Sequence, residues 1–316
     1  MSEYATGLFE NDSSYVIPPA NADNYLESIV KLCKEEKIEV IAPGSEPEIE
    51  KIAENQKIFE ENGIKTLTNT WDVIQKCRDK FSIIEVLNSK GISTPESFLF
   101  KSDLDVERIK KFPIIIKPRL GSGSRNVFLA NDKEETIFFA NYLKKYGSEP
   151  IIQEHIGDYE NEFTIGVLYA DNGNLITSIA MKRVLNGGLS VRQSIVNQET
   201  NEKFVISSGI SQGFFDDFEE IKKIGVKIAR ALNSDGPINI QCRKTADKII
   251  PFEVNPRFSG TTASRSLVGY NEPDILCKYR LFNEKPSIKS HKIGFVLKEL
   301  SEKFISIEDT KKIPRI

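Results

Sequence analysis

The sequence has few cysteines and histidines, and their scarcity and spacing argue against several kinds of site. Four cysteines lie far apart in 316 residues, and no two of them form a Cys-x-x-Cys pair. This spacing disfavours a zinc site or a disulfide framework and is typical of ordinary buried thiols. With two histidines in the whole chain, a histidine-based metal site is also disfavoured. These residues are Cys33, Cys77, Cys242, Cys277, His155 and His291.

The chain also lacks an excess of positive charge and any long apolar run. Its formal net charge is -3 and its pI is near 5.7, which gives no electrostatic case for binding nucleic acid. No apolar run approaches the length of a membrane span, and the amino terminus lacks the basic and apolar segments of a signal peptide. We therefore expect a cytoplasmic protein with no nucleic-acid partner and no membrane partner.

Helical and strand patterns alternate near the amino terminus, which predicts a small parallel sheet. Ser45-x-x-Glu48 is typical of a capping box at the start of a helix, and Gly63 of a helix end. The expected elements are a helix over 24–36, a strand over 38–42, a helix over 45–61 and a strand over 64–67.

The rest of the chain is expected to contain further helices, two groups of strands and a loop. Thr70 and Asp79 are the expected first residues of two helices, and Gly187-Gly188 should begin a mobile loop that includes Arg192. The other expected elements are strands over 98–100, 114–117, 126–130 and 151–156, a hairpin over 162–184, helices over 132–145 and 215–232, and an edge strand or a dimer contact within 291–304.

Polar side chains alternate along two neighbouring strand patterns and predict a metal site. Glu253, Asn255 and Arg257 project from one face of an extended strand. If residues 244–248 form a tight turn, Gln241 lies opposite Glu253 on the preceding strand. Oxygen ligands with few carboxylates suit Mg²⁺, which takes its remaining ligands from water and substrate phosphates. Arg257 would face the phosphate. The alternative is a solvated strand face with a surface ion pair.

A glycine-rich segment suggests a phosphate-binding loop. An apolar strand ends at Lys117 and continues into Gly121-Ser122-Gly123-Ser124. Glycines let backbone amides approach an anion closely, and the lysine adds a full charge. Because the loop lies between two strands, it does not fit a P-loop, and the catalytic motifs of protein kinases are absent. The alternative is a plain flexible turn.

The order of these parts resembles the ATP-grasp superfamily, above all the ATP-binding halves of the carbamoyl-phosphate synthase large chain and ATP-dependent carboxylate-amine ligases. The resemblance extends over residues 79–276 and implies an α/β and α+β ATP-grasp fold with a truncated N-terminal parallel-sheet domain. Family members hold ATP between two subdomains, one of which is a mobile lid. The implied domains are a partial N-terminal α/β domain over 1–78, a lid subdomain over 79–160, a C-terminal subdomain with the metal site over 161–284, and a tail over 285–316.

The resemblance also implies roles for individual residues. Lys80 and Lys117 would hold the phosphates, with the glycine-rich loop closing over them. Glu154 and the backbone of Ile156 would contact adenine, and Glu162 would bind the ribose, with Glu160 as a competing candidate. The implied metal ligands are Gln241, Glu253 and Asn255, while Arg257 would steady the transferring phosphoryl group together with Lys117.

Several further residues are candidates for binding the substrate. Either Lys182 or Arg183 should face the cleft, and hydroxyl groups and arginines downstream suit a substrate carboxylate. His155 follows the expected adenine contact but is interpreted as a rim residue. The other candidates are Arg192, Ser259, Thr261, Thr262 and Arg265, each with a structural role as the alternative.

The resemblance implies a magnesium-dependent ligase. Such an enzyme moves the γ-phosphate of ATP onto a small carboxylate and makes an acyl phosphate that an amine attacks. Two Mg²⁺ ions are expected, with Mn²⁺ as a substitute. The alternative is a catalytically silent ATP-binding regulatory or assembly subunit. Because only about fifteen residues precede Tyr15 to Pro18, we expect a second copy or a partner subunit to cover the N-terminal sheet.

Overall fold

The computed structural model describes residues 5–121, 123, 125–171, 173–185, 189–196, 201–284, 286 and 290–316. The chain forms two compact units, one made of Met1–Thr68 with Lys298–Ile316 and the other of Asn69–Leu297. The expected domain boundaries after residues 78, 160 and 284 stay predictions. Within the described ranges, none of the helices has the length and apolar character needed to cross a membrane.

The first unit contains short helices and a two-stranded parallel sheet. β1 (Val40–Ile41) pairs in parallel with β2 (Lys65–Thr66), which confirms the predicted sheet. The predicted capping box is present, since Ser45 and Glu48 bond to each other at the start of α2. The helices of this unit are η1 (Thr6–Phe9), α1 (Tyr25–Glu35), α2 (Glu46–Glu54), α3 (Gln56–Glu61) and α10 (Ile307–Lys311).

One predicted helix of this unit is divided in two. The pattern over 45–61 predicts a single helix, but the helical backbone is interrupted at Asn55, between α2 and α3. The Asn55 side chain donates a hydrogen bond from Nδ2 to the carbonyl oxygen of Lys51 at 2.9 Å. Asparagine side chains compete with the backbone for such hydrogen bonds, and this local competition favours a break.

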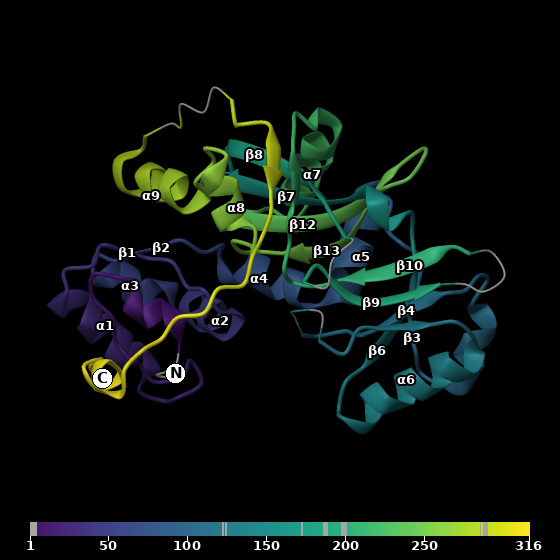
Figure 1. Ribbon diagram of the computed structural model, residues 1–316, viewed down its shortest axis with the longest axis horizontal. Helices are drawn as coiled ribbons and strands as arrows, with labels where there is room; N and C mark the ends of the chain where they lie inside the picture. The colour runs from purple at the N-terminus through teal and green to yellow at the C-terminus, as the bar shows by residue number, and fades with distance from the viewer. Residues whose placement is uncertain are drawn as a thin grey trace. The chain divides into compact units, whose positions relative to one another are not determined.

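The second unit begins with two helices and an antiparallel four-stranded sheet. The strand order is β3-β6-β4-β5, and α6 packs against this sheet (Figure 1). The elements are α4 (Trp71–Arg78), α5 (Lys80–Ser89), β3 (Ser97–Leu99), η2 (Asp103–Arg108), β4 (Ile114–Pro118), β5 (Phe128–Ala130), α6 (Lys133–Lys145) and β6 (Pro150–Glu154). We call β3 to β6 with η2 and α6 the small-sheet subdomain.

A six-stranded sheet forms the centre of the second unit. Its order is β13-β12-β7-β8-β11-β14, and β14 lies at one edge, which confirms the predicted edge strand. Its elements are η3 (Tyr159–Asn161), β7 (Glu162–Tyr169), β8 (Leu175–Arg183), β11 (Gly213–Phe215), α7 (Glu219–Ala231), β12 (Pro237–Lys244), β13 (Ile249–Asn255), α8 (Thr262–Leu267), α9 (Glu272–Phe282) and β14 (Gly294–Val296).

The two faces of this sheet differ in polarity. Phe163 and Ile165 on β7 point into an apolar core that α7 covers, where Gly225 lets the helix approach Ile165 closely. Glu162 and Thr164 alternate with them and point to the opposite face, yet they are equally buried. The opposite face is therefore a buried polar surface, and it provides part of the candidate site.

Two predictions about the middle of the chain are wrong. Arg192 does not lie in a loop, because β9 (Val191–Val196) pairs with β10 (Lys203–Ser207) in an antiparallel hairpin; Gly187-Gly188 lies outside the described residues. The helix expected from Phe215 begins only at Glu219, because Phe215 belongs to β11 and pairs with β8. In both segments, hydrogen bonding to another strand of a sheet decides the secondary structure, and the local sequence pattern does not.

We expect Gly166→Ala to destabilise the second unit. A Cβ atom at this position would lie 2.1 Å from Glu272 Oε1 and 2.2 Å from Arg265 Nη1. These atoms form a buried ion pair, which cannot move aside without losing its geometry. The expected loss in the free energy of unfolding is about 1–3 kcal/mol or more, measured by chemical denaturation. Gly209→Ala is the control, because its Cβ would meet no atom within 4 Å. Equal losses in the two variants would contradict this account.

Candidate functional site

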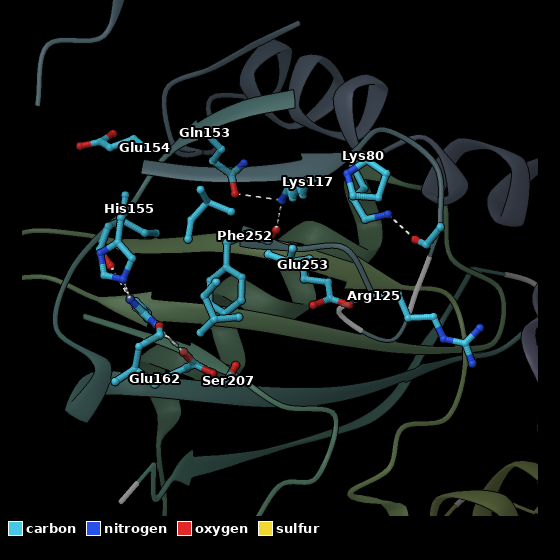
Figure 2. A pocket seen from close by; sticks show the side chains of 18 residues that line it. Lys80, Lys117, Arg125, Gln153, Glu154, His155, Glu162, Ser207, Phe252 and Glu253 are labelled. Atoms are coloured by element: carbon cyan, nitrogen blue, oxygen red, sulfur yellow. Dashed lines mark hydrogen bonds and ion pairs between the residues drawn. The ribbon is translucent and has the colours of Figure 1, made fainter. Parts of the chain in front are cut away.

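A cleft open to solvent lies in the second unit (Figure 2). One part of its wall is apolar, and the other part contains lysines, two arginines and carboxylates. The apolar wall is made by Ile115, Val127, Ile156, Val205, Ile206 and Phe252, and the polar lining includes Lys80, Lys117, Arg125, Gln153, Glu154, His155, Glu162, Ser207, Arg243 and Glu253.

Lys117 is a buried cation near the end of β4. Its Nζ donates hydrogen bonds to Gln153 Oε1 at 2.9 Å and to the carbonyl oxygen of Phe252 at 3.2 Å (Figure 2). Burial and the nearby Lys80 ammonium lower the pKa of Lys117 to about 8, while Glu253 opposes this shift. The ammonium is thus still largely protonated at pH 7. Because both hydrogen-bond acceptors are neutral, its charge favours an anion in the cleft.

Lys80 is held beside the glycine-rich loop by a neighbouring ion pair. Asp79 caps α5, and Arg119, which follows β4, donates to both oxygens of Asp79. Burial acts to raise the pKa of Asp79, but hydrogen bonds from Arg119 and from Ser82 lower it to about 2. Lys80 Nζ in turn donates to the carbonyl oxygen of Gly121. The start of the loop is therefore fixed to the start of α5.

The glycine-rich loop is described only in part. Gly121 and Gly123 have φ angles of +118° and +65°, a region that favours glycine. Gly121 lines the cleft, as does Arg125 at the far end of the loop. Ser122 and Ser124 lie outside the described residues, so their expected phosphate contacts stay predictions.

The segment after β6 is fixed by one arginine of the central sheet. Arg243 Nη1 donates to the carbonyl oxygen of Ile156 at 3.0 Å and contacts His155 Nε2 at 2.9 Å. Burial and the Arg243 charge lower the pKa of His155 to about 4, so its ring is neutral at pH 7. Glu154 is exposed at the rim, where its carboxylate accepts from the Glu96 backbone. His155, Glu154 and Ile156 all line the cleft.

Glu162 lies between two buried arginines. Its Oε1 accepts from Arg183 Nη1 at 2.7 Å, and its Oε2 accepts from Arg243 Nε at 3.0 Å. The side chains of both ion pairs are almost inaccessible to solvent. Breaking either pair would therefore leave a buried charge without a partner and would destabilise the protein. Glu160, by contrast, is exposed. The expected ribose contact of Glu162 stays a prediction, and its two oxygens already have strong partners.

The predicted hairpin register is confirmed. Gln241 pairs with Glu253 across β12 and β13, and Asn239 pairs with Asn255. Gln241 Nε2 donates to Glu253 Oε2 at 3.2 Å, and Asn255 Nδ2 donates to Glu253 Oε1 at 3.1 Å. A bulge at Phe252 lies between the two halves of the ladder. The amides of Gln241 and Asn255 therefore converge on the carboxylate of Glu253, the third proposed metal ligand.

Glu253, Asn255 and Gln241 fit Mg²⁺, but the amide oxygen of Gln241 also has a cationic partner. Mg²⁺ needs few protein ligands when phosphates and water complete its shell, so one carboxylate and two amides are sufficient. However, Gln241 Oε1 accepts from Arg183 Nη1 at 3.0 Å and shares that oxygen with a cation. Among the described residues, no cluster of three or more His, Cys, Asp or Glu side chains could hold a metal ion. Any metal here would therefore combine the Glu253 carboxylate with amide and phosphate oxygens.

The substrate candidates are placed in different surroundings. Arg183 and Arg265 are buried, and Arg265 Nη1 pairs with Glu272 at 2.8 Å. Arg192 is exposed on β9 and does not line the cleft. Ser259 and Thr261 bond to each other in the turn after β13. Arg257 lies in the same turn, where its Nη1 donates to the carbonyl oxygen of Phe258 at 3.0 Å. Their roles toward a substrate stay predictions.

Sequence reasoning missed several residues that line the cleft. Arg243 shares the strand face of Asn239 and Gln241, so extending that alternation by two residues would have found it. Gln153 was detectable as a polar residue in an apolar strand. Phe252 was not detectable, because the bulge that places its carbonyl oxygen near Lys117 has no sequence pattern.

Two family profiles match the chain in separate regions. Residues 1–67 match the family described as "PylC-like, N-terminal domain". Residues 150–303 match the family described as "ATP-grasp in the biosynthetic pathway with Ter operon". The second match includes β12 and β13 with their converging polar side chains.

Curated relatives and solved structures agree with these matches. The carbamoyl phosphate synthase large chain of Clostridium beijerinckii is 27% identical over 64% of this chain, which spans only 18% of that relative. Biotin carboxylase from Campylobacter jejuni superposes with a TM-score of 0.64 at 15% identity, covering 92% of this chain and 65% of that one. An L-amino acid ligase from Bacillus licheniformis has a TM-score of 0.59 at 19% identity, covering 84% and 62%. These structural likenesses establish the fold.

We expect the affinity for ATP to fall above pH 8. Without a ligand, the pKa of Lys117 is about 8. A bound polyphosphate would raise this pKa. Above pH 8, the Lys117 amine must therefore take up a proton when ATP binds. The association constant should fall by up to about tenfold per pH unit between about pH 8 and 10. Calorimetric titration with ATP in several buffers would measure both the affinity and the proton uptake. In Lys117→Met the dependence should disappear; an unchanged pH profile in that variant would refute the assignment.

We expect Glu162→Gln to destabilise the second unit far more than Glu160→Gln does. The first substitution leaves Arg183 and Arg243 without their shared buried carboxylate, which should cost about 3–5 kcal/mol of unfolding free energy. The second changes an exposed side chain and should cost within about 0.5 kcal/mol. Denaturant unfolding of both variants tests this prediction. Similar denaturation midpoints would show that other groups compensate the buried charges of the two arginines.

Proposed function

Because residues 150–303 match an ATP-grasp family profile, we propose that the chain is a member of the ATP-grasp superfamily and an ATP- and Mg²⁺-dependent ligase that joins a small carboxylate to an amine. In this proposal ATP activates the carboxylate as an acyl phosphate, which the amine then attacks. The superfamily supports the ligase class. The substrates are not indicated by the relatives, because the chain spans a small part of the length of those proteins.

The observation that most supports this proposal is the position of Lys117 relative to Glu253. The buried ammonium contacts the backbone of Phe252, the residue just before Glu253 (Figure 2). One end of the cleft therefore combines a positive charge with a carboxylate flanked by two amides. A metal triphosphate matches this combination, since its phosphates suit the lysine and its cation suits the oxygens.

The nucleotide would lie along the cleft with its phosphates at the Lys80 and Lys117 end. The apolar wall around Ile156 and Ile206 suits a flat base. Glu154 at the rim and the Ile156 backbone would contact adenine. For the ribose we keep Glu162, which lines the cleft although Arg183 and Arg243 also hold its oxygens. The exposed Glu160 is the alternative.

Phosphoryl transfer in this site would depend on positioning and charge. A carboxylate oxygen of the substrate forms a bond to the γ-phosphorus of ATP, and the bond from that phosphorus to the ADP oxygen breaks. The amine nitrogen then attacks the acyl carbon, inorganic phosphate leaves, and the nitrogen loses a proton. Lys80, Lys117 and Arg257 would bind the charged phosphoryl oxygens. Mg²⁺, held by Glu253, Asn255 and Gln241, would neutralise phosphate charge when bound. The proposal includes two Mg²⁺ ions in the site, with Mn²⁺ as a substitute for them.

The carboxylate substrate would bind beside the turn that follows β13. Ser259 and Thr261 place two hydroxyl groups there, and Arg257 precedes them. Arg192 and Arg265 are less suitable, because Arg192 is exposed outside the cleft and Arg265 is buried with Glu272. A second copy or a partner subunit over the β1–β2 sheet stays part of the proposal.

We expect the protein to release phosphate and ADP from ATP when the correct carboxylate is present. Pools of amino acids and other small carboxylic acids should be tested with Mg²⁺ and with hydroxylamine as a surrogate amine, since hydroxylamine converts an acyl phosphate into a hydroxamate. Detection of ADP with hydroxamate supports the proposal. AMP as the product would contradict γ-phosphoryl transfer, and tight ATP binding without turnover on any pool would favour a silent nucleotide-binding subunit.

Glu253→Gln should lower this activity about 10²- to 10³-fold, because a carboxylate that orders the metal triphosphate becomes neutral. Glu85→Gln, which changes an exposed glutamate of α5, is the matched control. The titration of activity against Mg²⁺ concentration should shift to higher concentration only in Glu253→Gln. A shift of equal size in both variants, or in neither, would remove Glu253 from the metal site.

A further inference from the structure

The helix α6 covers the sheet of the small-sheet subdomain (Figure 1). An exposed row of aromatic side chains runs along α6 and the residue that follows it: Phe138 is 66% exposed, Tyr142 40% and Tyr146 65%. We call these three residues the α6 patch. Large apolar side chains exposed side by side on a soluble protein mark an interaction surface more often than isolated ones do.

The α6 patch runs obliquely along the exposed side of the helix. Thr136, Ala140 and Leu143 form the buried face of α6. Phe138, Tyr142 and Tyr146 follow one another at intervals of four residues, so they form a single stripe. The ring centroids of Tyr142 and Tyr146 are 4.9 Å apart, and those of Tyr142 and Phe128 on β5 are 5.8 Å apart. The stripe therefore begins on the outer face at Phe138 and reaches the side that borders β5 at Tyr142.

The charges at the two ends of this stripe have opposite signs. Glu134 lies on the exposed face in the first turn, and Lys145 lies on the same face in the last turn. Their positions are almost symmetric about Ala140, six residues before it and five residues after it. Phe138 and Tyr142 are placed symmetrically about the same residue.

This symmetry makes the face complementary to itself. If two copies of α6 pack antiparallel about a two-fold axis near Ala140, Glu134 of each copy faces the region of Lys145 in the other. Phe138 of each copy then faces Tyr142 of the other. A two-fold interface requires that one surface match itself in both shape and charge. A helix pair of this kind also brings the side chains of the two copies into ordinary packing distance.

We propose that the α6 patch binds the same patch of a second copy, so that the protein forms an antiparallel two-fold dimer through α6. The dimer does not depend on the ligase activity. Because a single helix from each copy forms the contact, the dimer interface is smaller than the standard size and the dimer dissociates on dilution.

Sedimentation velocity over a range of protein concentrations tests the dimer with the full chain. We expect a reversible monomer–dimer equilibrium, and Phe138→Ser should raise its dissociation constant about tenfold or more, because a central aromatic residue contributes strongly to an interface. Leu267→Ser is the matched control, since Leu267 is 67% exposed on α8, outside the patch. A protein that stays monomeric at all concentrations, or a dimer that Phe138→Ser does not weaken, would overturn the proposal.

A charge reversal tests the antiparallel arrangement itself. Glu134→Lys alone and Lys145→Glu alone should each weaken self-association, because like charges then face one another. When these two variants are mixed, each Lys faces a Glu of the other chain, so a mixed dimer should form with an affinity near that of the unaltered protein. Failure of the mixture to associate more tightly than either variant alone would rule out this register.

Discussion

The carboxylate of Glu162 is the contact on which the rest of the site depends. It lies at the start of β7 and bonds to arginines on both neighbouring strands, Arg183 on β8 and Arg243 on β12. Each arginine donates a further hydrogen bond. Arg243 donates to the carbonyl oxygen of Ile156, and Arg183 donates to Oε1 of Gln241. One buried negative charge thereby connects the wall of the cleft expected to face a base with the residues expected to hold a metal.

This arrangement is available because the central sheet has two buried faces of different character. Strand alternation directs Phe163 and Ile165 toward α7, and it directs Glu162 and Thr164 to the side of the cleft. Polar groups so deeply buried are stable only with partners, and here these are other side chains of the same face. The result is a rigid polar surface, which suits a site that must hold charged groups in fixed positions.

The sequence could predict those parts of the fold and site that depend on local spacing. The pairing of Gln241 with Glu253 followed from strand alternation and a short turn, and the capping box at Ser45 followed from two residues. Features that depend on distant parts of the chain could not be predicted in this way. The strand around Arg192 exists because of its partner β10, and the buried charge of Glu162 is balanced by arginines on two other strands. Their roles toward ligands stay predictions.

The bulge at Phe252 has a consequence for comparing this chain with its relatives. In a regular strand the loss of one residue turns every following side chain to the other face. At the bulge it does not, because Phe252 is the extra residue between the pairs Gln241–Glu253 and Cys242–Pro251. A relative with one residue fewer at this point would keep Glu253 and Asn255 on the polar face, and it would lose the bulged carbonyl oxygen that accepts from Lys117.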